Sequence, residues 1–242
     1  MSDQNDEASS RERERHHDHE LRSFGRRRGR KLSPRQARLM HELLPRLAVD
    51  LSQPAPAQLA SLFGSAVQDV WLEIGFGGSE HLIWQAKHNP DVGLIGCEPF
   101  EEGVVKAVAA TEDGGLANVR IHPDDARQLL RWLSDGSVAR AFILFPDPWP
   151  KKKHVKRRLI NSALLDALAR VLKPSAELRV GTDIGDYART ILQAALTHPA
   201  FIWTAKRPSD WRIRGEDWPS TRYEQKAIRE GRRGYFFKFA RR

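Results

Sequence analysis

From residue 70 onward, short apolar runs alternate with longer stretches that have helical periodicity. This alternation is typical of a parallel sheet covered by helices on both faces. We expect strands near 70–74, 92–97, 118–122, 140–145 and 176–181, and helices near 79–88, 100–111, 125–133, 157–172 and 185–197. Two later strands, near 200–204 and 234–239, are expected to form a hairpin with an inserted loop. The predicted fold class is therefore α/β, with about seven mostly parallel strands.

The N-terminal region has a different character. Residues 1–33 show no hydrophobic periodicity, and from Arg22 to Arg35 the only charged side chains are seven cations, so we expect a disordered basic arm. Residues 34–64 are predicted to form a helical N-terminal extension, with a helix over 34–47, followed by a linker. Residues 65–242 are predicted to form the main domain.

The composition limits the environment and the partners. Forty Lys and Arg residues against thirty-one Asp and Glu give a net charge of +9, which indicates a polyanionic partner. No apolar run is long enough to span a membrane, and the first twenty residues do not resemble a secretion signal. The single cysteine, Cys97, excludes an internal disulfide and a multi-cysteine zinc site. We expect a cytoplasmic protein without a metal.

A carboxylate follows or closes each of the first five predicted strands. The carboxyl ends of the strands in an open α/β sheet border the ligand crevice, so these acids should meet at one edge. A single Asp at a helix start is more often an N-cap, but five in succession favour a site. The five residues are Glu73, Glu98, Asp125, Asp147 and Asp183.

The turn after the first strand, residues 75–79, contains glycines that allow close approach of a ligand. Gly75 and Gly77 are therefore candidate ligand-binding residues. Glu80 stands where a dinucleotide fingerprint needs Gly or Ala, and an acid there would repel pyrophosphate. Glu73 suits an amino-bearing ligand, and Glu98 suits ribose hydroxyls. A nucleoside with ammonium and sulfonium groups and no phosphate is S-adenosylmethionine, whose adenine would lie by Asp125.

The fourth strand ends in the sequence FPDPWPKKKHVKRR, residues 145–158. Pro146 and Pro148 restrict the backbone and would hold Asp147 and Trp149 at the crevice. Trp149 could stack on a base or pack in the core, and the sequence favours neither. The cations of residues 151–158 oppose the dipole of the helix expected to start there, which favours phosphate binding over a solvated face. A second basic stretch covers residues 226–242, and the expected substrate is nucleic acid.

The segments EIGFG, PDPWPKKKHVKRR, GTD and TRYE together resemble those of the tRNA (guanine-N7-)-methyltransferases over about residues 65–240. The resemblance implies a Rossmann-like class I methyltransferase domain and methylation of N7 of guanosine 46 in the tRNA variable loop. It implies S-adenosylmethionine as methyl donor, held by Glu73, Glu98, Asp125 and Asp147. Asp147 would be the active-site residue.

The same resemblance implies two further groups of residues. Substrate contacts would come from Lys151, Asp183, Thr221, Arg222, Tyr223 and Glu224, and RNA contacts from Lys153, His154, Val155, Lys156, Arg157 and Arg158. Lys153 stands where family members often have Arg, and Gly78 and Ser79 replace the third glycine of the loop. The expected partner is tRNA, and the expected assembly is a monomer or homodimer without an obligatory helper subunit.

Three other functions remain open at this point. An exocyclic-amine methyltransferase would have a second proline directly after the first, whereas here Trp149 separates Pro148 from Pro150. A non-catalytic RNA-binding protein on the same fold would be expected to lack one of the acids. A nicotinamide enzyme is disfavoured by Glu80. The histidines at positions 16, 17 and 19 suggest solvated side chains rather than a metal site.

Overall fold

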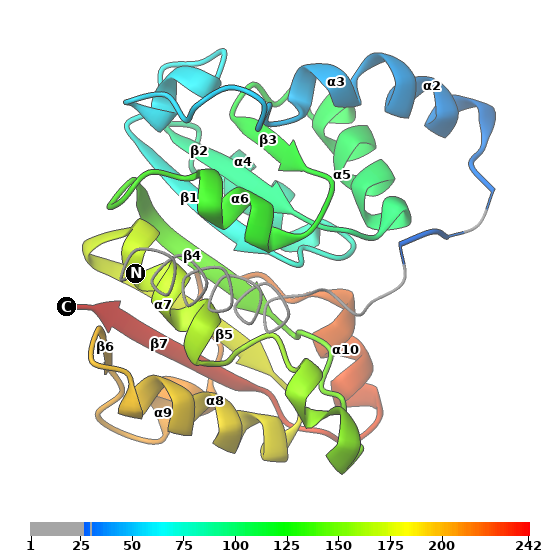
Figure 1. The fold of residues 1–242 in the computed structure, drawn as a ribbon. Helices are drawn as coiled ribbons and strands as arrows, with labels where there is room; N and C mark the ends of the chain where they lie inside the picture. The colour runs from blue at the N-terminus through cyan, green and yellow to red at the C-terminus, as the bar shows by residue number, and fades with distance from the viewer. Residues whose placement is uncertain (1–26, 30) are drawn as a thin grey trace, which may run out of the picture.

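The computed structural model describes residues 27–29 and 31–242 of the 242-residue chain (Figure 1). Most of the predicted basic arm, and the histidines at positions 16, 17 and 19, lie outside these residues. Residues 27–29 run beside the helix α5 (Glu101–Asp113), where the carbonyl oxygen of Arg27 accepts a hydrogen bond from the Glu101 N–H at 2.9 Å. The Arg27 guanidinium also pairs with Asp124 at 2.5 Å.

A seven-stranded sheet with the order β3-β2-β1-β4-β5-β7-β6 forms the centre of the molecule. The first five strands pair in parallel, whereas β7 runs antiparallel to both β5 and β6. The predicted hairpin of the last two strands is therefore confirmed. The strands are β1 (Asp69–Ile74), β2 (Val92–Cys97), β3 (Val119–His122), β4 (Val138–Leu144), β5 (Leu172–Thr182), β6 (Phe201–Trp203) and β7 (Tyr235–Arg241).

Helices cover both faces of the sheet, as expected for a mostly parallel arrangement (Figure 1). On one face, α6 (Ala126–Trp132), α7 (Ser162–Val171) and α8 (Gly185–Thr197) enclose the larger core with Leu72, Ile143 and Val180. On the other face, α4 (Glu80–His88) and α5 pack on Leu94 and Ile121. The loop that contains Trp218 continues this second face over β4.

The N-terminal extension packs against the domain. The expected helix over 34–47 is divided into α2 (Pro34–Glu42) and α3 (Leu44–Leu47) at Leu43, because Pro45 has no N–H with which to continue the hydrogen-bond ladder. Leu39 and Leu47 are buried against α5 and β3. Phe63, after the short helix η1 (Leu59–Leu62), contacts the sheet so closely that a Cβ on Gly93 would lie 2.3 Å from its ring.

The predicted start of one helix is wrong. We expected a helix over 157–172, but residues 152–157 form the 3-10 helix η2 (Lys152–Arg157), and α7 begins only at Ser162. Asn161 sets this start, because its side-chain oxygen accepts a hydrogen bond from the Leu164 N–H at 2.9 Å. The cations of the basic run are therefore not in the first turn of a long helix, and the dipole argument for them does not apply.

The chain order places a crevice at one edge of the sheet. The strand order runs outward from β1 to β3 in one direction and from β4 to β5 in the other, so connections leave β1 and β4 on opposite sides. In open α/β sheets, ligands bind at the carboxyl ends of the strands at such a switch point. The remaining helices, α9 (Ser209–Arg212) and α10 (Arg222–Arg229), belong to the long insertion between β6 and β7. No helix in the described part of the chain is long and apolar enough to cross a membrane.

Candidate active site

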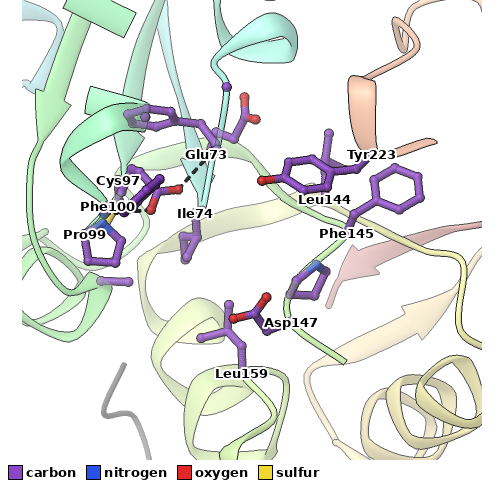
Figure 2. Close-up of a pocket in the computed structure, with 18 of the residues that line it drawn as sticks. Glu73, Ile74, Cys97, Pro99, Phe100, Leu144, Phe145, Asp147, Leu159 and Tyr223 are labelled. Atoms are coloured by element: carbon purple, nitrogen blue, oxygen red, sulfur yellow. Dashed lines mark hydrogen bonds between the residues drawn. The ribbon is translucent and has the colours of Figure 1, made fainter. Parts of the chain in front are cut away.

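A cavity of about 530 Å³ opens at the carboxyl ends of β1, β2 and β4. Four of the five predicted strand-end acids line it, namely Glu73, Glu98, Asp125 and Asp147. In Figure 2, Cys97, Pro99 and Phe100 form one side of this space, and Leu144, Phe145 and Tyr223 form the opposite side. Asp147 and Leu159 lie below it in the same view. The cavity thus combines acidic groups with apolar walls, as small-molecule sites usually do.

The glycine turn after β1 forms part of the cavity wall and requires glycine for its backbone. Gly75 and Gly77 have φ angles of 74° and 53°, a region that other residues seldom occupy. A Cβ on Gly75 would meet nothing within 4 Å, so the backbone there borders open space in the cavity. The turn is also held from behind, because a Cβ on Gly103 of α5 would lie 2.4 Å from the carbonyl oxygen of Gly77.

Glu98 is fixed by backbone hydrogen bonds at both carboxylate oxygens. Its Oε2 accepts from the Gly77 N–H at 2.8 Å, and its Oε1 accepts from the Phe100 N–H at 2.9 Å. Burial raises the pKa of Glu98, although these two N–H groups act in the opposite direction. A carboxylate oxygen has two lone pairs, so Glu98 can still accept hydrogen bonds from a ligand.

Asp125 and Glu73 are both buried at the cavity wall, and each has a partner in the protein. Asp125 is the N-cap of α6, where its Oδ1 accepts from the Arg127 N–H at 2.9 Å. The structural role that a single Asp would suggest is therefore real and coexists with a place in the cavity. Glu73 Oε2 lies 2.8 Å from Nδ1 of the buried His81 on α4.

Asp147 lies at the mouth of the cavity in a strained loop. The flanking residues Phe145 and Trp149 have φ angles of 52° and 42°, which are costly for side chains of this size. Such strain persists only where the surroundings impose it, and Pro146 and Pro148 restrict the loop further. The protein around Asp147 partly removes its hydration, and this burial raises its pKa.

Trp149 is half-buried and lines the cavity. It does not belong to the hydrophobic core clusters of the described residues. The Arg157 guanidinium lies 5.0 Å from its ring centroid, and the His154 ring meets it edge-on at 5.7 Å. Trp149, His154 and Arg157 therefore form one continuous surface at the mouth of the cavity.

The basic run separates into exposed cations and one buried arginine. Lys151, Lys152, Lys153 and Lys156 are exposed, as is Val155, whereas His154 and Arg157 are half-buried. The Arg158 side chain is only 3% exposed, and its guanidinium donates to the Pro148 carbonyl oxygen at 3.0 Å and to Asp186 at 2.5 Å. We therefore revise the prediction that Arg158 contacts RNA, because its guanidinium instead connects the strained loop to α8.

The segment 221–224 closes the cavity from the side of the glycine turn. Thr221, Arg222 and Tyr223 line the cavity, and the Tyr223 ring lies 3.1 Å from where a Cβ on Gly77 would stand. Arg222 forms an ion pair with Glu80, the acid that breaks the dinucleotide fingerprint. Glu80 thus secures the segment to the start of α4.

Three predicted substrate contacts do not line the cavity. Asp183 pairs with Arg232 at 2.6 Å, and Glu224 pairs with Arg214 at 3.1 Å. Lys151 is exposed just outside the cavity, after the strained loop. Asp183 follows the carboxyl end of β5 at the same edge of the sheet as the other four acids, but it pairs with Arg232 and does not line the cavity.

Sequence reasoning missed several lining residues. Pro99 and Phe100 follow the second strand end, and this position alone could have identified them. Leu159 and Lys106 also line the cavity, but they lie within ordinary apolar or charged patterns and carry no separate signal. Among the residues that the structure describes, no three His, Cys, Asp or Glu side chains are grouped as metal ligands.

The close contact of Gly103 with the glycine turn generates a first prediction. The change Gly103→Ala would place a methyl group 2.4 Å from the Gly77 carbonyl oxygen and 3.0 Å from Cγ of Glu98. We expect the turn and Glu98 to shift together, lowering the free energy of unfolding by about 1–3 kcal/mol. Urea unfolding measures this change.

Val105 on the same helix provides the control for this prediction. Val105 is buried on α5 but does not line the cavity. Val105→Ala is expected to lower the free energy of unfolding, because it leaves a void in the packing. If Gly103→Ala were as stable as the wild type, the close packing of α5 on the glycine turn would not restrict this position.

Comparison with known proteins agrees with this geometry. Residues 67–237 match the family model described as "Putative methyltransferase". The chain is 50% identical to a tRNA (guanine-N(7)-)-methyltransferase of Chelativorans sp., over 90% of this chain and 94% of the relative. A protein of the same name from Rhodospirillum rubrum is 46% identical, over 92% of this chain and 89% of the relative.

Solved structures agree on the fold. TrmN from Thermus thermophilus has a TM-score of 0.52 at 16% identity, covering 76% of this chain and 47% of that protein. The 16S rRNA methyltransferase KamB has a TM-score of 0.52 at 18% identity, covering 78% of this chain and 94% of that protein. Both structures support the Rossmann-like methyltransferase architecture, and the sequence relatives give the family. The chain belongs to the tRNA (guanine-N(7)-)-methyltransferase family.

Proposed function

We propose that this protein transfers a methyl group from S-adenosylmethionine to N7 of guanosine 46 in the variable loop of tRNA. Guanine-N7 methylation of tRNA follows from the family, and the nucleotide position is the part that we add. The observation that carries the proposal is that four carboxylates line one cavity whose mouth continues into an exposed basic surface. A cytoplasmic location, and a monomer or homodimer without a helper subunit, remain parts of the proposal.

The residues of the cavity fit S-adenosylmethionine. Gly75 exposes its backbone to the cavity, and Glu98 is held rigidly with lone pairs to spare for ribose hydroxyls. Pro99 and Phe100 supply apolar surface for a purine, and Asp125 lies on the same wall. Glu73 can accept hydrogen bonds from the amino group of the methionine part. Four acids in one cavity would repel a phosphate and favour a ligand with positive charges.

The chemistry requires placement and little proton transfer. S-adenosylmethionine supplies a methyl group on a positively charged sulfur. Guanine N7 carries a lone pair and no proton, so its methylation would need no general base from the protein, and the electron pair of the broken bond would stay on sulfur. The contribution of the protein would then be to hold N7 close to the methyl group, which makes such a reaction effectively unimolecular. Asp147, at the cavity mouth, would stabilise the positive charge that develops on the purine ring.

The half-buried Trp149 and the half-exposed Tyr223 offer aromatic faces for the guanine base. The helix η2 contacts Trp149 through His154 and Arg157, so the exposed lysines of η2 would contact the phosphates next to a base bound in the cavity. Lys151, Thr221 and Arg222 would contribute to the same binding surface. Asp183 and Glu224 would take part only if their ion pairs with Arg232 and Arg214 exchange for contacts with the substrate.

The direct test is methyl transfer to bulk tRNA that lacks modifications, using donor with a tritiated methyl group. We expect 7-methylguanosine as the labelled nucleoside, at a single site in the variable loop. The change Asp147→Asn removes the charge while keeping the size of the side chain. We expect it to lower kcat by about 100-fold or more and to leave tRNA affinity within about threefold, because the charge acts on the transition state.

Other products would contradict the proposal in distinct ways. A label on an exocyclic amine would show that the protein is a different methyltransferase. Normal tRNA binding without methyl transfer would show that it is a non-catalytic RNA-binding protein. Equal losses of kcat and tRNA affinity in Asp147→Asn would mean that this residue only maintains the fold. Asp91→Asn provides a matched control, since Asp91 is exposed, lies directly before β2 and is outside the cavity.

The salt dependence of tRNA binding tests the basic surface. The double change Lys153→Glu and Lys156→Glu reverses two exposed cations of η2. We expect weaker binding and a slope of log affinity against log salt concentration that is less negative by about 1 to 2, because fewer counterions are released. Filter binding at salt concentrations from about 50 to about 200 mM measures this slope.

The matched control makes the same change in net charge elsewhere. Lys87 lies in the last turn of α4, and Lys173, which pairs with Asp69 at 2.5 Å, lies near the start of β5, so both are at the edge of the sheet opposite to the cavity. Lys87→Glu together with Lys173→Glu should leave the slope close to that of the wild type. Equal slopes for the two double variants would show that η2 is not the docking surface.

A further inference from the structure

A chain of buried polar side chains runs from the cavity into the protein. Glu73 Oε2 lies 2.8 Å from His81 Nδ1, and His81 Nε2 lies 3.1 Å from Gln85 Nε2. Gln85 Nε2 also donates to the backbone carbonyl oxygen of Asp217 at 2.8 Å. Glu73, His81 and Gln85 are each at most 2% exposed. Polar groups buried to this degree need hydrogen-bond partners, and here each of the three side chains has a partner within this series.

Backbone carbonyl groups determine how the amides in this chain are oriented. Asn89 Nδ2 lies 2.9 Å from the Gln85 carbonyl oxygen, which can only accept, so this atom must be the amide nitrogen. The same nitrogen lies 3.1 Å from Gln85 Oε1, which therefore accepts. Gln85 Nε2 is then the donor on its other side, and its two hydrogens point to the Asp217 carbonyl oxygen and to His81.

This orientation fixes the tautomer of His81. Because Gln85 donates to Nε2, that nitrogen must accept and carry no proton, so the single ring proton of a neutral imidazole lies on Nδ1. Nδ1 is the atom that faces Glu73. We propose that His81 is a positioning residue, which as the Nδ1–H tautomer holds the Glu73 carboxylate in place to receive the amino group of the methyl donor.

The end of this hydrogen-bonded series that is farther from Glu73 connects to a second wall of the cavity. Asp217 is held at its backbone by Gln85 and at its side chain by Arg179, which donates to Oδ2 at 2.5 Å. The fully buried Trp218 follows, and the segment then continues to Thr221 and to Tyr223, which packs on Gly77. His81 and Gln85 thus connect the acid at the end of β1 with the base of the segment that closes the cavity.

Packing alone does not explain a histidine at this position. The next two residues on α4, Leu82 and Ile83, are apolar and buried, and the His81 ring packs edge-on against Phe142 at 4.6 Å. An apolar side chain could fill the same space, but it would leave the buried carboxylate of Glu73 without its hydrogen-bond donor, which is costly. The hydrogen bond to Glu73 therefore explains why the side chain at position 81 is an imidazole.

The inference rests on the proposed function, and the experiment separates the two. The probes are S-adenosylhomocysteine, which has the amino acid part of the donor, and 5′-methylthioadenosine, which lacks it. Calorimetry gives the affinity of each for the wild type, His81→Phe and His81→Asn. Because His81 acts through Glu73, we expect His81→Phe to weaken S-adenosylhomocysteine by about tenfold or more and to leave methylthioadenosine within about twofold.

His81→Asn is the conservative variant, because its amide N–H can replace Nδ1–H toward Glu73. We expect it to recover part of the affinity for S-adenosylhomocysteine that His81→Phe loses. In the ligand-free wild type, nitrogen-15 NMR of the imidazole should show a protonated Nδ1 and an unprotonated Nε2. Far-ultraviolet circular dichroism checks that both variants are folded.

Several results would overturn the inference. If His81→Phe weakened both probes equally, His81 would only support the shape of the site. A proton on Nε2 in the NMR spectrum would contradict the assigned tautomer. Either result leaves the proposed function intact when the wild type binds S-adenosylhomocysteine. If the wild type bound neither probe, the proposed donor site itself would be wrong, and the role of His81 with it.

Discussion

The structure depends on keeping several carboxylates partly or fully out of water at one edge of a parallel sheet. Burying a charge without partners is costly, so each buried acid of the cavity has a hydrogen-bond donor within the fold. Glu98 has two backbone N–H groups, Asp125 has the N–H of Arg127, and Glu73 has His81. The donors come from the glycine turn, from Phe100 directly before α5, and from α4 and α6.

The surroundings of Asp147 differ from those of the other three acids. It lies on a loop in which Phe145 and Trp149 have positive φ angles, and its side chain is exposed where the other three are buried, although the surrounding protein partly removes its hydration. Arg158 holds the Pro148 carbonyl oxygen of this loop and anchors it to Asp186 and Thr190 on α8. In the proposed function, the three acids fixed in the walls would bind the donor, and Asp147 at the mouth would face the base.

The sequence predicted the sheet well because its strands are short apolar runs bounded by clear helical stretches. It also predicted that Glu73, Glu98, Asp125 and Asp147 would meet, because parallel strands end at one edge. It failed where a distant partner decides the outcome. Asp183 binds Arg232, and Arg158 turns inward to bind Asp186, and neither pairing leaves a local pattern. His81 looks like an ordinary helical residue until its two neighbours are placed beside it.

A crystal structure with bound S-adenosylhomocysteine tests the central claim most directly. Our account predicts the ribose at Glu98, the adenine beside Asp125, the amino group at Glu73, and the sulfur facing Asp147 and the basic surface. A ligand bound outside this cavity, or one that leaves Glu73 and Glu98 without contacts, would contradict it.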